Sequence, residues 1–381
     1  MILPDYKNGS VVNLASSILR AFGAGSSYKP LVELKDLREA KNVILLVVDG
    51  LGYEYTMANG DNSILRRNVV RKLTSVFPAT TASALIALET GVAPQQHGIT
   101  GWFMHLKELG AVSAILPFVP RCQGDPFTQS GVERSQIFTE KRINEKIKSP
   151  SFIIYPKKIV DGKVNKKEKN VLTHDSLDEM FSKVKKIIKK NKSRKYIYAY
   201  WPEFDSLSHF RGVKSKFVRD HFYELDWKIS TFLESIKGTN TTLIVTADHG
   251  LIDTSIFKRI FLADHPQLEE TLSLPLCGEP RAAYCYVHAS RKKQFEDYVK
   301  AKLSYCCTVH KSEELIKKGY FGLFEPNRKL FDRVGDYVLI MKDNYIIKDR
   351  LLNEPSRIFI GNHGGMSPEE MFVPLILFKN I

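Results

Sequence analysis

The sequence lacks the features that mark membrane and secreted proteins. No apolar run approaches the roughly 20 residues that a membrane-spanning helix needs. The N-terminal stretch has no basic start followed by a continuous apolar segment, so it does not predict a signal peptide. The five cysteines are odd in number and form no Cys-x-x-Cys pair, and we expect reduced thiols with no catalytic role. Together these absences favour a cytoplasmic protein.

Familiar functional signatures are missing as well. The chain contains neither the GxxxxGKS or GxxxxGKT phosphate loop nor the HExxH motif of zinc proteases. The stretch "FGAGSS" at 22–27 is superficially similar to a dinucleotide-binding loop, but it lacks a third glycine and no predicted strand precedes it. The function must therefore be sought in other residues.

Positive charge, by contrast, is abundant. The chain has 56 Lys and Arg against 42 Asp and Glu, a formal net charge of +14, and much of the excess lies in 157–195. A basic run can bind nucleic acid or another anionic surface. This run has few aromatic residues to stack on bases, and no recognised nucleic-acid module accompanies it. We therefore favour a solvated lysine-rich loop and helix face, and expect no specific nucleic-acid binding.

Apolar material is sufficient for a large core, since 43% of the 381 residues are hydrophobic. Continuous apolar runs of strand length alternate with stretches of helical periodicity. Such alternation indicates an α/β protein with a largely parallel sheet covered on both faces. Within it, we expect residues from about 255 to 360 to form a smaller lobe. The predicted strands are 42–48, 110–116, 151–155, 195–201, 243–246, 281–288, 336–341 and 372–378, and the predicted helices are 82–88, 175–190 and 214–236.

Carboxylate and imidazole side chains follow or precede several of these strands. In doubly wound sheets, ligands bind beyond the carboxyl ends of the strands. Each such residue taken alone is explained as well by a turn or by chance. Their joint occurrence favours a site for two divalent metal ions, most naturally zinc, because the set holds oxygen and nitrogen ligands but no cysteine. The residues concerned are Asp49, Asp205, His209, Asp248, His249 and His363.

A hydroxyl nucleophile would complete such a site. Two metal ions about 3.5–4 Å apart can bind the attacking and leaving oxygens of a phosphoryl transfer. Thr80, Thr81 and Ser83 lie at the start of a predicted helix, where the helix dipole and free amides favour an anion. Thr80 or Thr81 can also be a simple N-cap, and spacing alone does not choose between them.

Five motifs together resemble the alkaline phosphatase superfamily. In chain order they are "VVDGLGYE", "VFPATTASALIALETGVAPQQHGITGW", "PEFDSLSHFRG", "TADHG" and "NHGG". They look most like the type I phosphodiesterase/nucleotide pyrophosphatase family, and the resemblance covers roughly 42–376. It implies an alkaline phosphatase-like fold, a three-layer sandwich formed by a single catalytic domain over 1–381, with two zinc ions at one end of the sheet. Manganese is the alternative metal.

The resemblance also implies a role for each residue. Thr81 rather than Thr80 would be the nucleophile, because it lies three residues after Pro78 and ten before Gly91. It would attack phosphorus in line and form a phospho-threonine that water then hydrolyses. One zinc ion would be held by Asp49, Thr81, Asp248 and His249, and the other by Asp205, His209 and His363.

The chain departs from the nucleotide pyrophosphatases in two places. After the nucleophile they carry Phe-Pro-Asn, whereas this chain has "ASA" at 82–84. Where they place an asparagine that hydrogen-bonds the phosphoryl oxygen, the spacing gives Trp102. Losing that donor weakens transition-state stabilisation unless another donor, such as an amide at the helix start, replaces it. Trp102 and Phe103 are either substrate-binding residues, stacking on a base or lining a leaving-group pocket, or ordinary core aromatics.

Three functions remain open at this point. The first is a two-metal phosphodiesterase acting on a nucleotide or another small phosphodiester. The second is a phosphomonoesterase or phosphosugar mutase of the same superfamily, which the threonine nucleophile and the lack of a clear large inserted domain disfavour. The third is a non-catalytic binding protein, disfavoured because every metal-site position holds a competent residue. The physiological substrate and the oligomeric state are not predicted.

Overall fold

The central element of the fold is a seven-stranded sheet. The computed structural model describes residues 1–122, 124–158, 170–190, 192–352, 354 and 359–381. The inner strands pair in parallel, and one strand near the edge is antiparallel to both of its neighbours, so the prediction of a largely parallel sheet is confirmed. In spatial order the strands are β2 (Val69–Thr74), β18 (Phe372–Phe378), β9 (Thr241–Thr246), β1 (Asn42–Val48), β8 (Lys195–Trp201), β6 (Ser151–Pro156) and β7 (Val171–His174).

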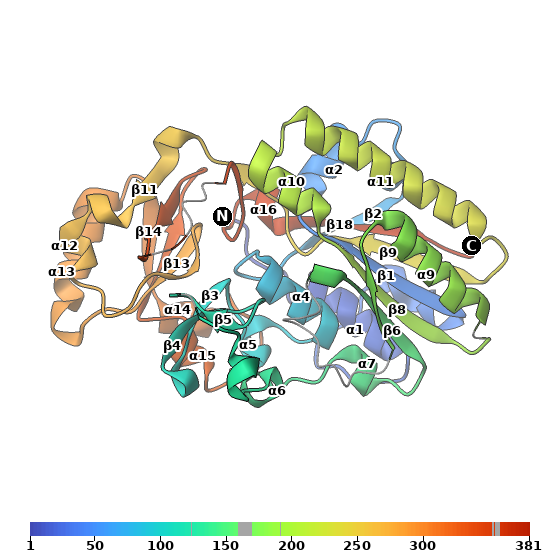
Figure 1. Cartoon of the computed structure of the whole chain (residues 1–381), viewed down its shortest axis with the longest axis horizontal. Coiled ribbons are helices and arrows are strands. Elements are labelled where there is room, and N and C mark those ends of the chain that lie inside the picture. The colour runs from blue at the N-terminus through green and yellow to red at the C-terminus, as the bar shows by residue number, and fades with distance from the viewer. Residues whose placement is uncertain (123, 159–169, 191, 353, 355–358) are drawn as a thin grey trace.

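Helices cover both faces of this sheet (Figure 1). On one side lie α1 (Val11–Ala21) and α4 (Thr81–Thr90). On the other side lie α2 (Tyr53–Asn59), α9 (Leu177–Lys190), α10 (Glu203–Arg211) and α11 (Lys216–Ser235). All seven residues of β1 are buried because both helical layers pack against it. The chain is thus the three-layer sandwich that the sequence predicts.

A second sheet of seven antiparallel strands forms the smaller lobe at the left of Figure 1. Three of its strands come from outside residues 255–360, so the sheet draws on two separate parts of the chain. The strands are, in order, β14 (Cys307–Lys311), β15 (Tyr337–Met341), β13 (Ala282–Cys285), β12 (Cys277–Glu279), β3 (Phe103–Leu106), β4 (Ala111–Ala114) and β5 (Val119–Pro120).

The two faces of this second sheet bury different cores. Ala283 and Cys285 face a cluster that includes α13 (Lys292–Tyr298). Tyr284 faces the opposite cluster, which contains Phe77 from the segment just before α4. The second sheet therefore packs directly against the start of α4, where the predicted nucleophile lies.

Shorter elements connect these parts. Two pairs of short strands form small sheets of their own. The antiparallel pair is β10 (Ile252–Asp253) with β17 (Gly361–Asn362), and the parallel pair is β11 (Arg259–Phe261) with β16 (Ile346–Lys348). The short α-helices are α3 (Ile64–Arg67), α5 (Pro94–His97), α6 (Arg134–Ile137), α7 (Ile143–Lys146), α12 (Pro266–Glu269), α14 (Ser312–Lys317), α15 (Leu330–Arg333) and α16 (Pro368–Met371).

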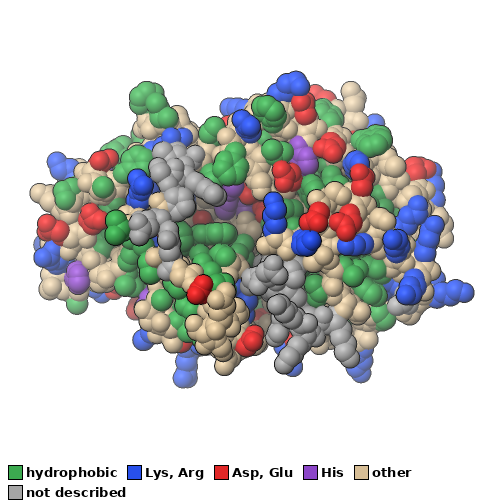
Figure 2. Space-filling view, in the orientation of Figure 1, with side chains coloured by type: hydrophobic (Ala, Val, Ile, Leu, Met, Phe, Trp, Pro, Cys, Tyr) green, Lys and Arg blue, Asp and Glu red, His purple; other side chains and the backbone are tan. Residues whose placement is uncertain are grey.

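The basic run is partly described. Helix α9 buries its apolar stripe against the sheet. It has Asp178 and Glu179 in its first turn and Lys189 and Lys190 in its last, an arrangement that the helix dipole favours. Lys and Arg side chains are frequent on the surface around it (Figure 2). Residues 159–169 and 191 of the run lie outside the described residues.

Within the described part of the chain, every helix is too short or too polar to cross a membrane.

Candidate active site

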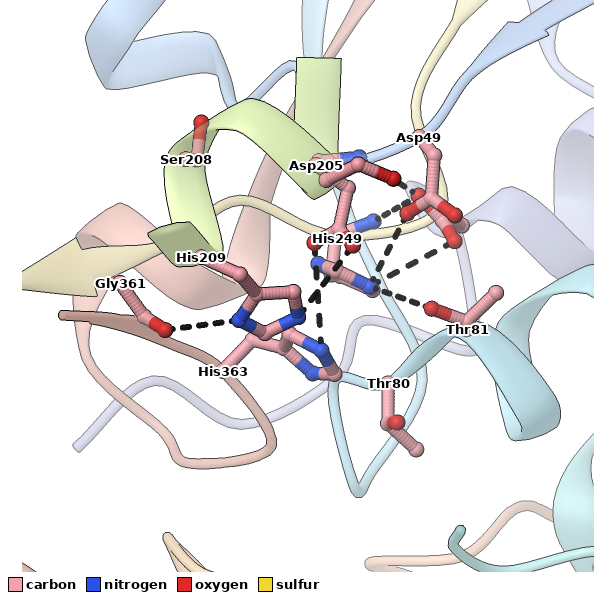
Figure 3. Close-up of polar contacts among 12 residues, drawn as sticks. Asp49, Thr80, Thr81, Asp205, Ser208, His209, His249, Gly361 and His363 are labelled. Atoms are coloured by element: carbon pink, nitrogen blue, oxygen red, sulfur yellow. Dashed lines mark hydrogen bonds and ion pairs between the residues drawn. The ribbon is translucent and has the colours of Figure 1, made fainter. Parts of the chain in front are cut away.

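The predicted metal ligands lie together at the carboxyl ends of β1, β8 and β9 (Figure 3). Because these three strands are parallel neighbours, the residues that follow them meet at one edge of the sheet. In the space-filling view, a histidine side chain is visible in the hollow between the two halves of the molecule, next to hydrophobic side chains (Figure 2).

The first group of side chains is held at the ends of β1 and β9. Tyr200 donates a hydrogen bond from its hydroxyl to Oδ2 of Asp49. Oδ1 of Asp248 accepts backbone N–H bonds from Gly50 and His249, each at 3.0 Å. The other oxygens, Oδ1 of Asp49 and Oδ2 of Asp248, are buried and have no hydrogen-bond partner. Each carboxylate is therefore oriented through one oxygen and leaves the other free.

The His249 ring is oriented in the same way. Its Nδ1 lies 3.0 Å from the carbonyl oxygen of Gly250, so this nitrogen carries the proton. The other ring nitrogen, Nε2, lies 3.0 Å from Oγ1 of Thr81, 3.4 Å from Oδ1 of Asp49 and 3.5 Å from Oδ2 of Asp248. This nitrogen faces the two unpartnered carboxylate oxygens.

The second group comes from α10 and from the loop that follows β17. Asp205 and His209 are one turn apart on α10, with Oδ2 and Nε2 separated by 3.2 Å. Nδ1 of His209 lies 2.7 Å from the carbonyl oxygen of Gly361. The His363 ring stacks on His249 with 3.9 Å between centroids, and its Nε2 lies 4.0 Å from Oδ1 of Asp205. Oδ1 of Asp205 and Nδ1 of His363 are buried without a hydrogen-bond partner.

Two of these groupings could hold metal ions. Buried polar atoms in folded proteins are almost always hydrogen-bonded, so the three unpartnered carboxylate oxygens of Asp49, Asp205 and Asp248, gathered beside the histidine rings, indicate that something else binds there. Carboxylate oxygens and imidazole nitrogens are the ligands that zinc and similar divalent ions accept. The tight groups are Asp49, Asp248 and His249, and Asp205, His249 and His363. His249 belongs to both, and His209 adjoins the second through Asp205.

The electrostatics of the site also call for cations. Burial is the largest cause that raises the pKa of Asp49 well above its usual range, and repulsion from Asp248 and Asp205 adds to it. Burial is likewise the largest cause that lowers the pKa of His363 well below its usual range, and repulsion from the His249 ring adds to it. Concentrated negative charge and an imidazole held neutral are both suited to a bound metal ion, which needs carboxylates ionised and histidines unprotonated.

The two threonines at the start of α4 have different surroundings. Thr81 is the first residue of the helix, and its hydroxyl points toward His249 (Figure 3). Thr80 occupies the N-cap position but caps nothing with its side chain. Its hydroxyl instead donates a 2.6 Å hydrogen bond to Glu279 and points away from the metal cluster (Figure 3). Only Thr81 of the two faces the cluster.

Trp102 and Phe103 lie at the edge of the site, where β3 begins. Trp102 is 38% exposed, and its backbone N–H donates a 2.7 Å bond to Glu279. Phe103 is half-buried beneath the guanidinium of Arg121, which lies 4.2 Å from its ring centre. Trp102 therefore has free surface for a substrate, whereas Phe103 is engaged in a cation–π contact within the second sheet.

Two further residues of the site are absent from the sequence-based set. Tyr200 is one of three tyrosines in the buried strand β8 and has no sequence feature that separates it from the others. Glu279 lies on β12, and its neighbours at the site are distant in sequence, with Thr80 199 residues away. Only the three-dimensional structure could identify either residue.

An α/β sandwich with buried carboxylates, imidazoles and a hydroxyl at the carboxyl edge of its sheet is the architecture of a hydrolase of the alkaline phosphatase superfamily. The family model described as type I phosphodiesterase / nucleotide pyrophosphatase matches residues 43–366. The chain belongs to this family and is a phosphoric ester hydrolase. A search of curated proteins found no match.

Solved structures share the fold. Murine ectonucleotide pyrophosphatase/phosphodiesterase 5 (ENPP5) is 19% identical, with a TM-score of 0.65 over 87% of each chain. Human ENPP5 is 17% identical, with a TM-score of 0.64 over 89% of each chain. Phosphonoacetate hydrolase from Sinorhizobium meliloti 1021, solved with phosphonoformate, is 18% identical, with a TM-score of 0.62 over 88% of this chain and 89% of its own. At these identities the likeness shows the fold.

Proposed function

We propose that the protein is a two-zinc phosphodiesterase that acts on a nucleotide or another small phosphodiester through a phospho-threonine intermediate. The observation that carries the proposal is the position of the Thr81 hydroxyl, 3.0 Å from Nε2 of His249 and at the start of α4. A hydroxyl beside a group of metal ligands, at a helix N-terminus that attracts anions, is where a phosphoryl group would be bound and attacked.

The residues have separate tasks in this proposal. Asp49, Asp248 and His249 would hold one metal ion, with Thr81 beside it, and Asp205, His209 and His363 would hold the other. When bound, zinc would supply the positive charge that favours an ionised hydroxyl and stabilises charge on the phosphoryl oxygens.

The reaction itself would use Thr81 twice. In the first step Oγ1 of Thr81 loses its proton to solvent and bonds to phosphorus as the bond to the leaving oxygen breaks, and the leaving group departs with the electron pair. In the second step a water molecule loses a proton and its oxygen attacks phosphorus, the P–Oγ1 bond breaks, and Oγ1 of Thr81 takes up a proton again. Thr80 does not compete, because its hydroxyl is bound to Glu279. Amides at the start of α4 would replace the asparagine side-chain amide for which this chain has Trp102.

A similar protein and the family name support the substrate class. Murine ENPP5, named as a nucleotide pyrophosphatase and phosphodiesterase, has also been solved as an inactive variant in complex with AMP. The family name itself specifies phosphodiesters and nucleotide pyrophosphates.

A cytoplasmic location is part of the proposal, because all five cysteines are free, as is usual in a reducing compartment. Fractionation of the source cells would check the location.

The experiment that tests the function compares two substrates and measures the metal. The purified protein is expected to contain two equivalents of zinc by elemental analysis and to hydrolyse bis-p-nitrophenyl phosphate faster than p-nitrophenyl phosphate. A strong preference for the monoester would favour the alternative function, a phosphomonoesterase of the same superfamily. Finding manganese instead of zinc would change the metal in the proposal but not the proposed reaction.

A further inference from the structure

Glu279 is a buried carboxylate at the active site that none of the metal groupings uses. It ends β12 and is 6% exposed. Its Oε1 accepts both of its hydrogen bonds, 2.6 Å from Oγ1 of Thr80 and 2.7 Å from the backbone nitrogen of Trp102. Its Oε2 has no partner among the described residues, yet it is not one of the fully buried unpartnered atoms, so it retains solvent contact. One oxygen is thus anchored and the other is free.

Contacts on two sides place this carboxylate between the start of α4 and the loop that carries His363. Thr80 precedes the nucleophile Thr81 in the chain and joins Glu279 to the start of α4. On another side, Gly364, which follows His363, leaves room for the Glu279 side chain. A Cβ at Gly364 would lie 2.5 Å from Cβ and 2.7 Å from Cγ of Glu279. Glu279 therefore packs between the nucleophile segment and a loop that carries a predicted metal ligand.

The ionisation of Glu279 is shifted by its surroundings. Burial raises the pKa of Glu279 to about 7, against the opposing effects of its hydrogen bonds with Thr80 and Trp102. The side chain is therefore a carboxylate in moderately alkaline solution, and it adds negative charge to the site without being a predicted ligand.

We propose that Glu279 is a specificity-determining residue whose free carboxylate oxygen disfavours dianionic phosphomonoesters and so selects monoanionic phosphodiesters. This inference rests on the proposed phosphodiesterase function. A phosphodiester carries one negative charge, whereas a monoester carries two above its second pKa of about 6. Because the repulsion between like charges grows in proportion to the charge, a fixed carboxylate repels a dianion about twice as strongly as a monoanion at the same distance, and more strongly still in a poorly solvated site than in water.

Two substrates with the same leaving group isolate this effect. At about pH 8.5, p-nitrophenyl phosphate is a dianion and methyl p-nitrophenyl phosphate is a monoanion, so they differ by one methyl group and one charge. The substitution Glu279→Gln keeps an oxygen that can accept from Thr80 and Trp102 but removes the charge. We expect Glu279→Gln to raise the ratio of kcat/KM for the monoester to that for the diester by about tenfold or more.

Two control variants separate charge from architecture. Thr80→Val removes the hydrogen bond to Glu279 but keeps its charge, so it should leave the substrate ratio unchanged even if both rates fall. Glu313→Gln removes an exposed surface carboxylate on α14 and should change neither rate nor ratio. An unchanged ratio in a folded, zinc-loaded Glu279→Gln variant would overturn the inference and leave Glu279 as a structural residue.

A binding measurement tests the inference if Glu279→Gln folds but hydrolyses both substrates too slowly for kinetics. Titration calorimetry with inorganic phosphate, largely dianionic at this pH, should show at least several-fold tighter binding to zinc-loaded Glu279→Gln than to the wild type, and equal affinities would contradict the inference. If Glu279→Gln does not fold, the wild type alone still decides, because a monoester rate equal to the diester rate excludes selection by charge. Failure of the wild type to hydrolyse either substrate would instead contradict the proposed function itself.

Discussion

Oγ1 of Thr81 lies 3.0 Å from Nε2 of His249, whereas Oγ1 of the adjacent Thr80 lies 2.6 Å from Oε1 of Glu279. Two neighbouring hydroxyls of the same type are therefore directed into different surroundings, one toward the predicted metal ligands and one toward the second sheet. The difference arises because Thr80 has extended N-cap geometry and Thr81 begins the helix. It makes the two threonines a matched pair for mutation.

Removing the proposed nucleophile should abolish turnover without loss of the proposed zinc ions. Thr81→Ala is expected to lower kcat on a phosphodiester by at least about a thousandfold, because it removes the proposed nucleophile and the neighbouring Thr80 hydroxyl is bound to Glu279. Thr80→Val should retain activity within about tenfold, because it loses only a supporting hydrogen bond. Steady-state kinetics and zinc analysis on both variants check this. The opposite ranking would mean that Thr80 is the nucleophile.

Tyr200 should control metal affinity rather than chemistry. Its hydroxyl donates to Oδ2 of Asp49 and so orients the oxygen that faces His249. Loss of such a supporting contact commonly weakens metal binding by about 10- to 100-fold. We expect Tyr200→Phe to need more zinc for full activity but to approach the wild-type kcat when saturated. Competition with a chelator measures the affinity, and a kcat that stays low at saturating zinc would contradict this role.

Metal removal should destabilise the protein as well as inactivate it. Without a cation, Asp49, Asp205 and Asp248 concentrate negative charge in a buried space, and the pKa of Asp49 is raised accordingly. Any ion that binds only the folded state adds stability in proportion to the logarithm of its concentration over Kd. We expect the melting temperature to fall on dialysis against a chelator and to recover with zinc. No change in melting temperature would argue against a resident metal.

The central sheet was predictable because its inner strands are continuous apolar runs. The predicted boundaries of β1, β8 and β18 agree with the structure, since strands buried on both faces contain few polar residues to confuse the pattern. The strand β2 was missed because it lies at the edge of the sheet and mixes Arg71 and Lys72 with apolar residues. Such a strand depends on pairing with β18, which local sequence does not encode.

The residues of the site also fall into those that the sequence could predict and those that it could not. Asp49, Asp248 and His249 follow strands whose ends could be located, so their proximity could be predicted, although their role as ligands stays a prediction. Tyr200 and Glu279 could not be identified, because each is defined by a partner more than 150 residues away. Sequence patterns report which residues a strand delivers to an edge, but not which side chains orient them.

The final prediction concerns the buried ion pair of Arg281 and Glu370, which joins the second sheet to the loop that carries His363. The guanidinium contacts both carboxylate oxygens, at 3.0 and 2.7 Å, and both side chains are at most 1% exposed. Oε1 of Glu370 also accepts the backbone N–H of Gly365 at 2.8 Å. Glu370→Leu should lower the free energy of unfolding by about 3–5 kcal/mol, because it leaves the Arg281 charge buried and unpaired.

The double variant Arg281→Leu with Glu370→Leu should be more stable than Glu370→Leu alone, because it removes the unpaired charge while losing the same bond to Gly365. The pair also has a defined pH dependence. Burial alone would raise the pKa of Glu370, but Arg281 holds it below its usual value, so its stabilisation is complete above about pH 4.3 and is lost as the pH falls through the folded-state pKa. In urea denaturation, the stability difference between wild type and Glu370→Leu should therefore shrink on acidification below about pH 4.3. A difference that stays constant into strong acid would show that the ion pair is not what the substitution removes.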